Sequence, residues 1–407
     1  MKISKLTSLV FVLGAILYSS KVDAKNVPNI LESGRESRLL LVQVNSQDPK
    51  FYIKRGEARL ESGDVKGALE DFNQALRLNP NDAEAYNNIG IIRFQSGDKK
   101  GAMEYLNKSL RLDPNDAVVY SNRGDFRNEL EDVKGAIEDY NQALRLNPKY
   151  IEVYHRRGNV RLKSEDVKGA IEDYNQALRL NPKYAVAYNN RGFARRQLGD
   201  NKGAIEDFNQ ALLLDPNEAV AYGNRGFSRF QSRDKKGAME DFNQALRLNP
   251  KYAEAYYFRG YMQFESGNVK EAMEDLNQSL LLNPKYAEAY AGRGAIRFKS
   301  GDKKGAMEDL KQALLLNPKN AEAYAIRGSI QFELKNIKEA MEDFNQSLLL
   351  NPKYAEAYFM RGTALVLSGD MKGTIKDLQK ASELFQQQGK IAEYQKTLDL
   401  IQQINNR

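Results

Sequence analysis

Apolar residues recur at helical spacing along most of this chain, in short stretches separated by turns rich in Gly, Asp and Ser. From residue 49 to residue 388 two apolar patterns alternate, each with the three- and four-residue spacing of an amphipathic α-helix. A turn such as Ser96-Gly97-Asp98 separates the two patterns, and Asn-Pro or Asp-Pro follows the second. The pattern predicts an all-α chain of helical hairpins. We expect the Asp after each turn to cap the second helix, as at Asp64, Asp98, Asp132, Asp166 and Asp200.

The hairpins repeat with a period of 34 residues. Nine prolines (Pro80 to Pro352) and ten glycines (Gly56 to Gly362) keep this period, and a Tyr stands four residues before each glycine. A hairpin of this size cannot bury its apolar face alone, so we expect the repeats to stack into one solenoid. Mid-helix Gly costs roughly 1 kcal/mol against Ala. We therefore expect each glycine to let two helices approach closely, with an Ala such as Ala136 facing it.

The spacing of Tyr, Gly, Ala and Pro resembles the tetratricopeptide repeat. The resemblance covers residues 49–388, where the last repeat departs by carrying Thr374 in place of Ala and no closing Pro. It implies a right-handed superhelical solenoid of ten helix-turn-helix repeats, with the first helices lining its groove. Residues 389–407 carry one apolar stripe, and we expect them to form a C-terminal capping helix and tail.

The first 24 residues are typical of a signal peptide. Lys2 and Lys5 precede an apolar run from Leu6 to Tyr18, and Val22-Asp23-Ala24 follows, with small residues at the two positions that a signal peptidase reads for cleavage after Ala24. We expect cleavage there, an exported protein in a periplasmic, secreted or equivalent lumenal compartment, and no stable membrane span after cleavage. The alternative is an uncleaved N-terminal membrane anchor. Residues 25–48 are expected to be a linker or an N-terminal cap.

Composition argues against several classes of function. The chain carries 61 Lys and Arg against 54 Asp and Glu, mixed along every repeat, without the basic block of a nucleic-acid binder. It has no Cys and a single His, which removes most metal sites and the usual nucleophile and base pairs. We expect no catalytic residue, no metal, no cofactor and no enzyme activity. A hydrolase would need an unmatched, buried carboxylate in the groove, and we expect His155 to be solvated or to contact a peptide.

Comparison of the repeats with one another indicates an internal ion pair. Nine repeats place Arg just before the glycine and Asp fifteen residues after it, as in Arg157 and Asp173. The second repeat lacks both and carries Ile89 and Tyr105 instead. We infer that the Arg and the Asp pair across the two helices of one hairpin, and that an apolar contact replaced them together in the second repeat.

A lysine recurs in all ten repeats, two residues before the alanine slot, from Lys66 to Lys372. One interpretation is a cationic stripe that binds an acidic polymer or a membrane. The other is that each lysine except Lys372 pairs with a Glu four residues later, as Lys134 with Glu138, in a solvated contact of small worth.

Residues that differ between repeats are the candidates for binding. Two residues before the glycine, early repeats carry Asn, interrupted once by Arg. One later repeat alone combines the three aromatic residues Tyr257, Phe258 and Tyr261. Members of the resembled family that bind extended peptides often place Asn in the first of these slots, where the amide can donate to and accept from a peptide backbone. Buried aromatic residues commonly dominate binding energy. The peptide-binding candidates are Asn88, Asn122, Arg156, Asn190, Asn224, Tyr257, Phe258 and Tyr261.

The sequence therefore predicts a non-catalytic scaffold that binds an extended peptide or a helix of another protein in its groove. The alternative is a surface or cell-wall protein that binds acidic polymers through the lysine stripe. Neither interpretation involves nucleic acid, and self-association through the groove stays open.

Overall fold

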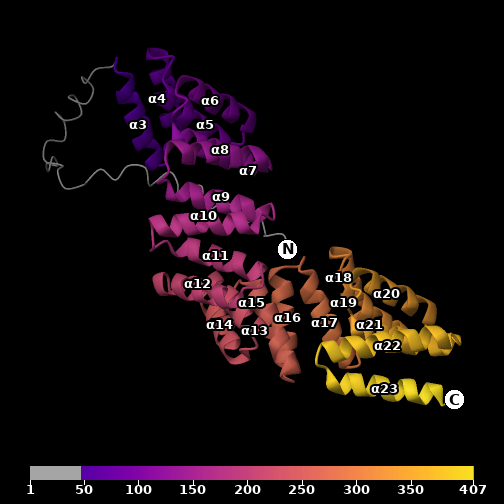
Figure 1. The fold of residues 1–407 in the computed structure, drawn as a ribbon. Helices are drawn as coiled ribbons and strands as arrows, with labels where there is room; N and C mark the ends of the chain where they lie inside the picture. The colour runs from indigo at the N-terminus through magenta and orange to yellow at the C-terminus, as the bar shows by residue number, and fades with distance from the viewer. Residues whose placement is uncertain (1–46, 407) are drawn as a thin grey trace. The chain divides into compact units, whose positions relative to one another are not determined.

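The computed structural model describes residues 47–406, and within that range every regular element is an α-helix (Figure 1). The expected signal peptide and nearly all of residues 25–48 lie outside the described residues. The chain forms two compact units, one that ends at Lys183 and one that begins at Tyr184. We call them the N-terminal unit and the C-terminal unit and describe each by itself.

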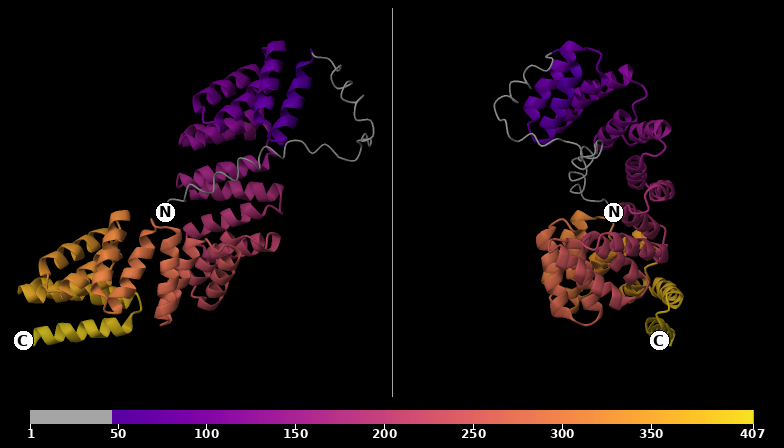
Figure 2. Two further views of the ribbon diagram at one scale, coloured as in Figure 1. Left: turned by 180° about the vertical axis from the view of Figure 1, so that it is seen from behind. Right: turned by 90° about the vertical axis from the view of Figure 1, so that its left-hand side faces the viewer.

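Each repeat is a pair of antiparallel helices, a first and a second, as predicted (Figure 2). Repeats one to four form the N-terminal unit. Their helices are α3 (Pro49–Glu61), α4 (Val65–Leu78), α5 (Ala83–Gln95), α6 (Lys99–Leu112), α7 (Ala117–Glu129), α8 (Val133–Leu146), α9 (Ile151–Lys163) and α10 (Val167–Leu180).

Repeats five to ten and one further helix form the C-terminal unit. The helices are α11 (Ala185–Gln197), α12 (Asn201–Leu214), α13 (Ala219–Gln231), α14 (Lys235–Leu248), α15 (Ala253–Glu265), α16 (Val269–Leu282), α17 (Ala287–Lys299), α18 (Lys303–Leu316), α19 (Ala321–Glu333), α20 (Ile337–Leu350), α21 (Ala355–Ser368), α22 (Met371–Gln387) and α23 (Ile391–Asn405). Helix α23 packs on α22, and Tyr394 contacts the cluster of Ala381, Leu384 and Phe385. Every helix of residues 47–406 is too short or too polar to cross a lipid bilayer.

Aspartates begin most of the second helices, as predicted. Asp64 Oδ1 accepts from the amide of Gly67, and the same contact recurs at Asp98, Asp132, Asp166 and Asp200. A Cβ on Gly67 would lie 2.1 Å from Asp64 Oδ2, so the cap requires glycine at this position. Repeats seven and nine have Glu there, and their Asn268 and Asn336 accept no capping hydrogen bond. Cap and glycine have therefore changed together.

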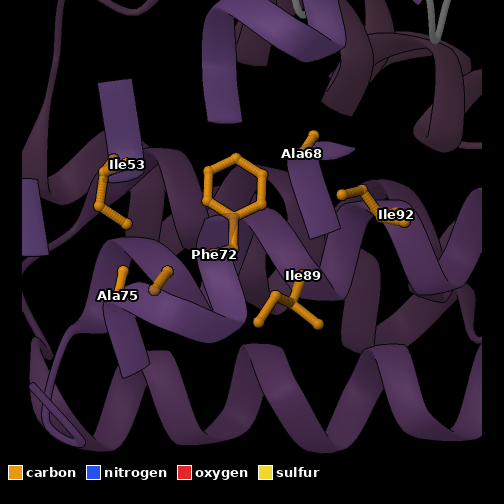
Figure 3. Close-up of a cluster of buried hydrophobic side chains, with 7 residues drawn as sticks. Ile53, Ala68, Phe72, Ala75, Ile89 and Ile92 are labelled. Carbon is orange, nitrogen blue, oxygen red and sulfur yellow. The ribbon is translucent and has the colours of Figure 1, made fainter. Parts of the chain in front are cut away.

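The core is a series of small clusters that join neighbouring hairpins. In the first, the ring of Phe72 lies among side chains from α3, α4 and α5 (Figure 3). The labelled members are Ile53, Ala68, Phe72, Ala75, Ile89 and Ile92. Because the cluster uses residues of the next repeat, a hairpin completes its core only by stacking.

The mid-helix glycines accommodate a side chain more than the predicted alanine. A Cβ on Gly124 would lie 2.7 Å from the Tyr140 ring, and one on Gly56 would lie 2.6 Å from the Phe72 ring. The alanine contributes its backbone in other repeats, where the Ala102 carbonyl oxygen would lie 3.3 Å from a Cβ on Gly90. Close approach is confirmed, and the large residue of the second helix is its main cause.

First helices of consecutive repeats also contact each other, from α5 to α9 in the N-terminal unit and from α11 to α21 in the C-terminal unit. They therefore form a continuous side within each unit, which we call the first-helix face. All the predicted peptide-binding residues belong to first helices.

Candidate functional site

The predicted Arg and Asp pairs are present in all nine repeats that carry both residues. The arginine Nε and Nη2 atoms donate to the two carboxylate oxygens, as between Arg225 and Asp241 at 2.9 and 2.6 Å. The aspartates are at most 5% exposed. The pairs are Arg55–Asp71, Arg123–Asp139, Arg157–Asp173, Arg191–Asp207, Arg225–Asp241, Arg259–Asp275, Arg293–Asp309, Arg327–Asp343 and Arg361–Asp377. The repeated aspartates are thus structural groups.

The exceptional second repeat has the apolar contact that was predicted. Ile89 is 1% exposed, and Tyr105 packs against the cluster that contains it. The guanidinium of Arg93 lies 4.6 Å from the centre of the Tyr105 ring. In repeat four the equivalent Arg161 reaches Asp173 instead. Arg93 also forms an ion pair with Asp98, with Nη1 2.7 Å from Oδ2. The Tyr105 ring therefore stands in for the second-helix carboxylate, while Arg93 keeps Asp98 as its charged partner.

The paired arginines also join neighbouring repeats. Their Nη1 atoms donate to an Asn on the second helix of the preceding repeat, as Arg157 does to Asn141 Oδ1 at 2.6 Å. This bridge recurs at Arg123–Asn107, Arg225–Asn209, Arg259–Asn243, Arg293–Asn277 and Arg361–Asn345. For Arg327 the position holds Lys311, which cannot accept a hydrogen bond. The junction between repeats eight and nine therefore lacks this bridge.

In the N-terminal unit, Asn88 and Asn122 belong to a short chain of amides. Asn122 Nδ2 donates to Asn87 Oδ1 at 3.1 Å, and Asn87 Nδ2 lies 3.5 Å from Asn88 Oδ1. The Nδ2 atom of Asn88 is shielded from solvent without a hydrogen bond among the described atoms. The two predicted residues are thus linked through Asn87, which the sequence comparison missed.

The C-terminal unit repeats this arrangement with Asn190 and Asn224. Asn224 Nδ2 donates to Asn189 Oδ1 at 3.3 Å, and Asn189 Nδ2 donates to Asn190 Oδ1 at 3.3 Å. The occurrence of Asn in two adjacent positions of repeats two and five was the sequence signal for Asn87 and Asn189.

Arg156 forms an ion pair within the protein. Its Nη1 atom donates to Asp125 Oδ2 at 2.5 Å and to Ser121 Oγ at 2.9 Å. The hydroxyl of Tyr140 donates to the other oxygen of Asp125 at 2.7 Å. Burial raises the pKa of Asp125, and the charge of Arg156 opposes this shift. Asp125 is therefore a matched carboxylate, and Arg156 joins repeats three and four.

His155 is buried, so the prediction of a solvated or peptide-contacting histidine is wrong. Its side chain is 3% exposed and lies beside the Tyr174 ring, with the ring centres 6.0 Å apart. Asn159 Nδ2 lies 3.4 Å from His155 Nε2. Burial, assisted by the neighbouring Arg156 charge, lowers the pKa of His155 to about 4. The imidazole is neutral at pH 7 and part of the packing.

The three aromatic candidates of repeat seven have different surroundings. Phe258 packs inward, with its ring centre 4.6 Å from that of Phe227 and 5.8 Å from that of Phe242. Tyr257 lies against Tyr286 of the next repeat, with ring centres 5.1 Å apart. Phe258 is thus a packing residue, a structural role that its prediction as a peptide-binding candidate did not anticipate.

Tyr261 is the most exposed of the three, at 37%, and its ring meets Phe230 edge to face. Burial, together with the charge of Glu265, raises the pKa of Tyr261 to about 12. Its hydroxyl is protonated at neutral pH and lies close to the Glu265 carboxylate.

The lysine stripe is exposed along both units. Of the ten lysines, only Lys270 lies within ion-pair distance of its Glu among residues 47–406, with Nζ 4.0 Å from Glu274 Oε1. The expected pairing with Glu is therefore largely unformed. Within residues 47–406, no group of three or more His, Cys, Asp or Glu side chains lies close enough together to hold a metal ion.

Arg196 is a first-helix residue that the sequence comparison missed. Its guanidinium lies over the rings of Phe193 and Phe227. It stands four residues after the glycine, where the other nine repeats have an apolar residue or Asn. A comparison of that slot across the repeats would have identified it.

Models of the tetratricopeptide repeat match residues 53–117, 185–218, 219–252, 287–320 and 321–354. A model described as the TPR repeat matches residues 124–165, 158–197 and 260–301. Comparison with curated protein sequences gives no significant match.

Solved structures show a similar fold. A tetratricopeptide repeat protein from Parabacteroides merdae is 21% identical over 61% of this chain and 98% of its own, with a TM-score of 0.50. YrrB, described as a TPR protein with an unusual peptide-binding site, is 23% identical over 46% of this chain and 96% of its own, with a TM-score of 0.39. PilF of Pseudomonas aeruginosa is 18% identical over 53% and 96%, with a TM-score of 0.46.

Proposed function

Because this chain belongs to the tetratricopeptide-repeat family, whose members are protein-interaction scaffolds, we propose that it binds an extended segment of a partner protein along its first-helix faces. The observation that supports the proposal is that first and second helices differ in how much their sequences vary between repeats. The second helices repeat nearly the same sequence, whereas the first helices carry the residues that differ between repeats. Those differing residues are the linked amides, Tyr261 and the aromatic groups around it.

The amides suit a peptide backbone. Asn88 and Asn122 are each hydrogen-bonded to Asn87. These contacts fix the orientation of both amides without using all their donors and acceptors. A peptide laid across them would exchange backbone hydrogen bonds with the amide atoms that remain open to solvent. We also propose that the protein is not an enzyme, because the aspartates of the nine Arg–Asp pairs and Asp125 each form an ion pair with arginine.

We further propose that the protein is exported, from the apolar run Leu6 to Tyr18 behind Lys2 and Lys5. The partner would then share its compartment. An uncleaved leader would instead anchor the same scaffold to a membrane, and mass measurement of the N-terminus distinguishes the two forms.

The test is capture of partners from an extract of the exported compartment with residues 25–407. The matched variant carries Asn88→Ala, Asn122→Ala, Asn190→Ala and Asn224→Ala, and circular dichroism checks that its helices are retained. A protein captured by the original chain and lost from the variant supports groove recognition, and a peptide scan of that protein locates the bound segment. Equal capture by both rejects the amides as the site.

The lysine stripe favours a second candidate, since nine of its ten lysines form no ion pair among the described residues. A chain using it would bind an acidic polymer by counterion release, so its affinity would fall steeply with salt. Polyglutamate is the probe, and a variant with Lys66, Lys100, Lys134 and Lys168 changed to Gln is the control. Binding to polyglutamate that these changes abolish supports this function, and absence of binding at low salt rejects it.

A further inference from the structure

Arg196 on α11 is held between aromatic rings of consecutive repeats. Its Cζ atom lies 4.8 Å from the ring centre of Phe193 and 4.6 Å from that of Phe227. The Phe227 ring is itself fixed by its edge contact with Phe258. A guanidinium that uses its flat faces for ring contacts keeps its N–H groups available along the edge.

The residues that the structure describes give Arg196 no ion-pair partner, although its neighbour is paired. Arg195 reaches Asp207, and that carboxylate is shared with Arg191. Burial lowers the pKa of Arg196 to about 10, and only interaction with Tyr252 opposes the shift. Arg196 is therefore a partly buried charged group that has no anionic partner within residues 47–406. Such a charge is costly unless a partner compensates it.

The other repeats show that the fold does not need this arginine. Its slot, four residues after the glycine, holds Leu60, Phe94, Asn128, Leu162, Phe230, Phe264, Phe298, Phe332 and Val366 elsewhere. Phe is thus the common residue, and it packs there without a charge. Arg196 replaces an uncharged side chain in that slot, and within residues 47–406 it gains ring contacts but no ion pair.

We propose that Arg196 binds the carboxylate of a peptide seated on the first-helix face of the C-terminal unit, a step that rests on the proposed scaffold function. The N–H edge supplies two parallel donors that match the geometry of a carboxylate. The aromatic groups beside it, with Phe230 against Tyr261, offer an apolar surface for the adjacent peptide residue. A single cation balances one carboxylate, whereas a phosphate carries about −1.5 to −2 charges.

The carboxylate could belong to an Asp or Glu side chain or to the C-terminus of the partner, and the test separates these sources. Peptides are selected on the full chain from a displayed library, then synthesised in three forms: unchanged, with each Asp or Glu replaced by its amide, and with the C-terminus amidated. Fluorescence anisotropy gives the affinity of each form for the wild-type chain. The same measurements are made on Arg196→Gln, on Arg196→Phe, which copies repeat six, and on the control Arg247→Gln, which removes an exposed arginine.

We expect one of the two neutralised forms to bind the wild-type chain roughly 10- to 100-fold more weakly than the parent peptide, as for loss of a charge-assisted hydrogen bond. Arg196→Gln and Arg196→Phe should bind the parent as weakly and should no longer distinguish it from that form. Arg247→Gln should behave as wild type. If peptides bind but Arg196→Gln and Arg247→Gln are equivalent, the carboxylate site is overturned and the scaffold function stands. Selection of no binding peptide would overturn both.

Discussion

Arg157 donates two hydrogen bonds to the carboxylate of Asp173, from Nε at 3.0 Å and from Nη2 at 2.5 Å. The aspartate is 1% exposed, so the pair joins the two helices of repeat four in a poorly hydrated site. Leaving one partner of such a pair typically costs about 3 to 5 kcal/mol, whereas replacing both by packed apolar groups can be neutral. Repeat two shows the replacement already made, with Ile89 and Tyr105.

We therefore expect Asp173→Tyr to lower the free energy of unfolding by about 3 kcal/mol and Arg157→Ile to lower it by less, because Arg161 still contacts Asp173 in that variant. The double variant should lose less than Asp173→Tyr alone. The new tyrosine would stack on Arg161, as Tyr105 does on Arg93. Urea denaturation of the four proteins gives the coupling energy. The exposed pair Lys270 and Glu274 is the control, with an expected coupling of less than about 1 kcal/mol. Additive losses at 157 and 173 would show that the pair is not a unit.

Lys311→Asn should stabilise the protein. It supplies the acceptor that Arg327 lacks and that Asn277 provides to Arg293 at 2.7 Å. A hydrogen bond to a charged group contributes about 1.5 to 3 kcal/mol, and we expect about 1 kcal/mol at this partly exposed junction. The reciprocal change Asn277→Lys should cost a similar amount. Thermal denaturation followed by circular dichroism measures both, and an unchanged or lower midpoint for Lys311→Asn would refute the bridge.

Acidification should weaken the N-terminal unit through His155. Its folded pKa of about 4 lies below the ordinary 6.5, so the unfolded chain binds more protons between these values. Stability is present above pH 6.5 and is lost as the pH falls toward 4, by up to about 3 kcal/mol. The variant His155→Asn copies repeat five, where Asn189 stands, and should lack this part of the pH dependence.

Nuclear magnetic resonance can follow this residue directly, because the chain has one histidine. The ring signals should titrate with a midpoint near 4. A midpoint near 6.5 would mean that the imidazole is hydrated in the folded protein.

Two glycine substitutions should have opposite effects. A Cβ at Gly124 would lie 2.7 Å from the buried Tyr140 ring, so Gly124→Ala should cost about 1 to 3 kcal/mol by overpacking. At Gly292 the nearest atom would be 3.6 Å away, an ordinary contact, so Gly292→Ala should gain up to about 1 kcal/mol of helix propensity. Denaturation midpoints of the two variants check the sign of each change, and equal effects would contradict the packing explanation.

The hairpins and the Arg and Asp pairs could be predicted from the sequence because both depend on spacing within one repeat. Repeat two lacks both residues, and this joint absence was enough to predict that the Arg and the Asp contact each other. Burial of His155 could not be predicted, because the depth of a first-helix residue depends on the Tyr174 ring that covers it. A polar side chain among arginines gives no sign of this.

Contacts between side chains of different repeats could likewise not be predicted from the sequence. Phe258 packs against Phe227 and Phe242, which lie on the two helices of the preceding repeat. Lysine and glutamate four residues apart can meet on a helix, yet exposed side chains keep most of their freedom unless the contact gains more than it costs in entropy. Spacing therefore indicated a pairing that only Lys270 shows within residues 47–406.

Four leucines on second helices project from the C-terminal unit in the slot where five other repeats carry arginine. Leu213, Leu281, Leu315 and Leu349 are 73–75% exposed, so the packing of the repeats places little demand on them. Because the chain has no cysteine, two cysteines introduced in this slot would be its only thiols, and both would be open to labelling. Energy transfer between dyes at 281 and 349 would then measure the distance between these two repeats. A change on addition of a peptide would show whether binding lengthens or shortens this part of the solenoid.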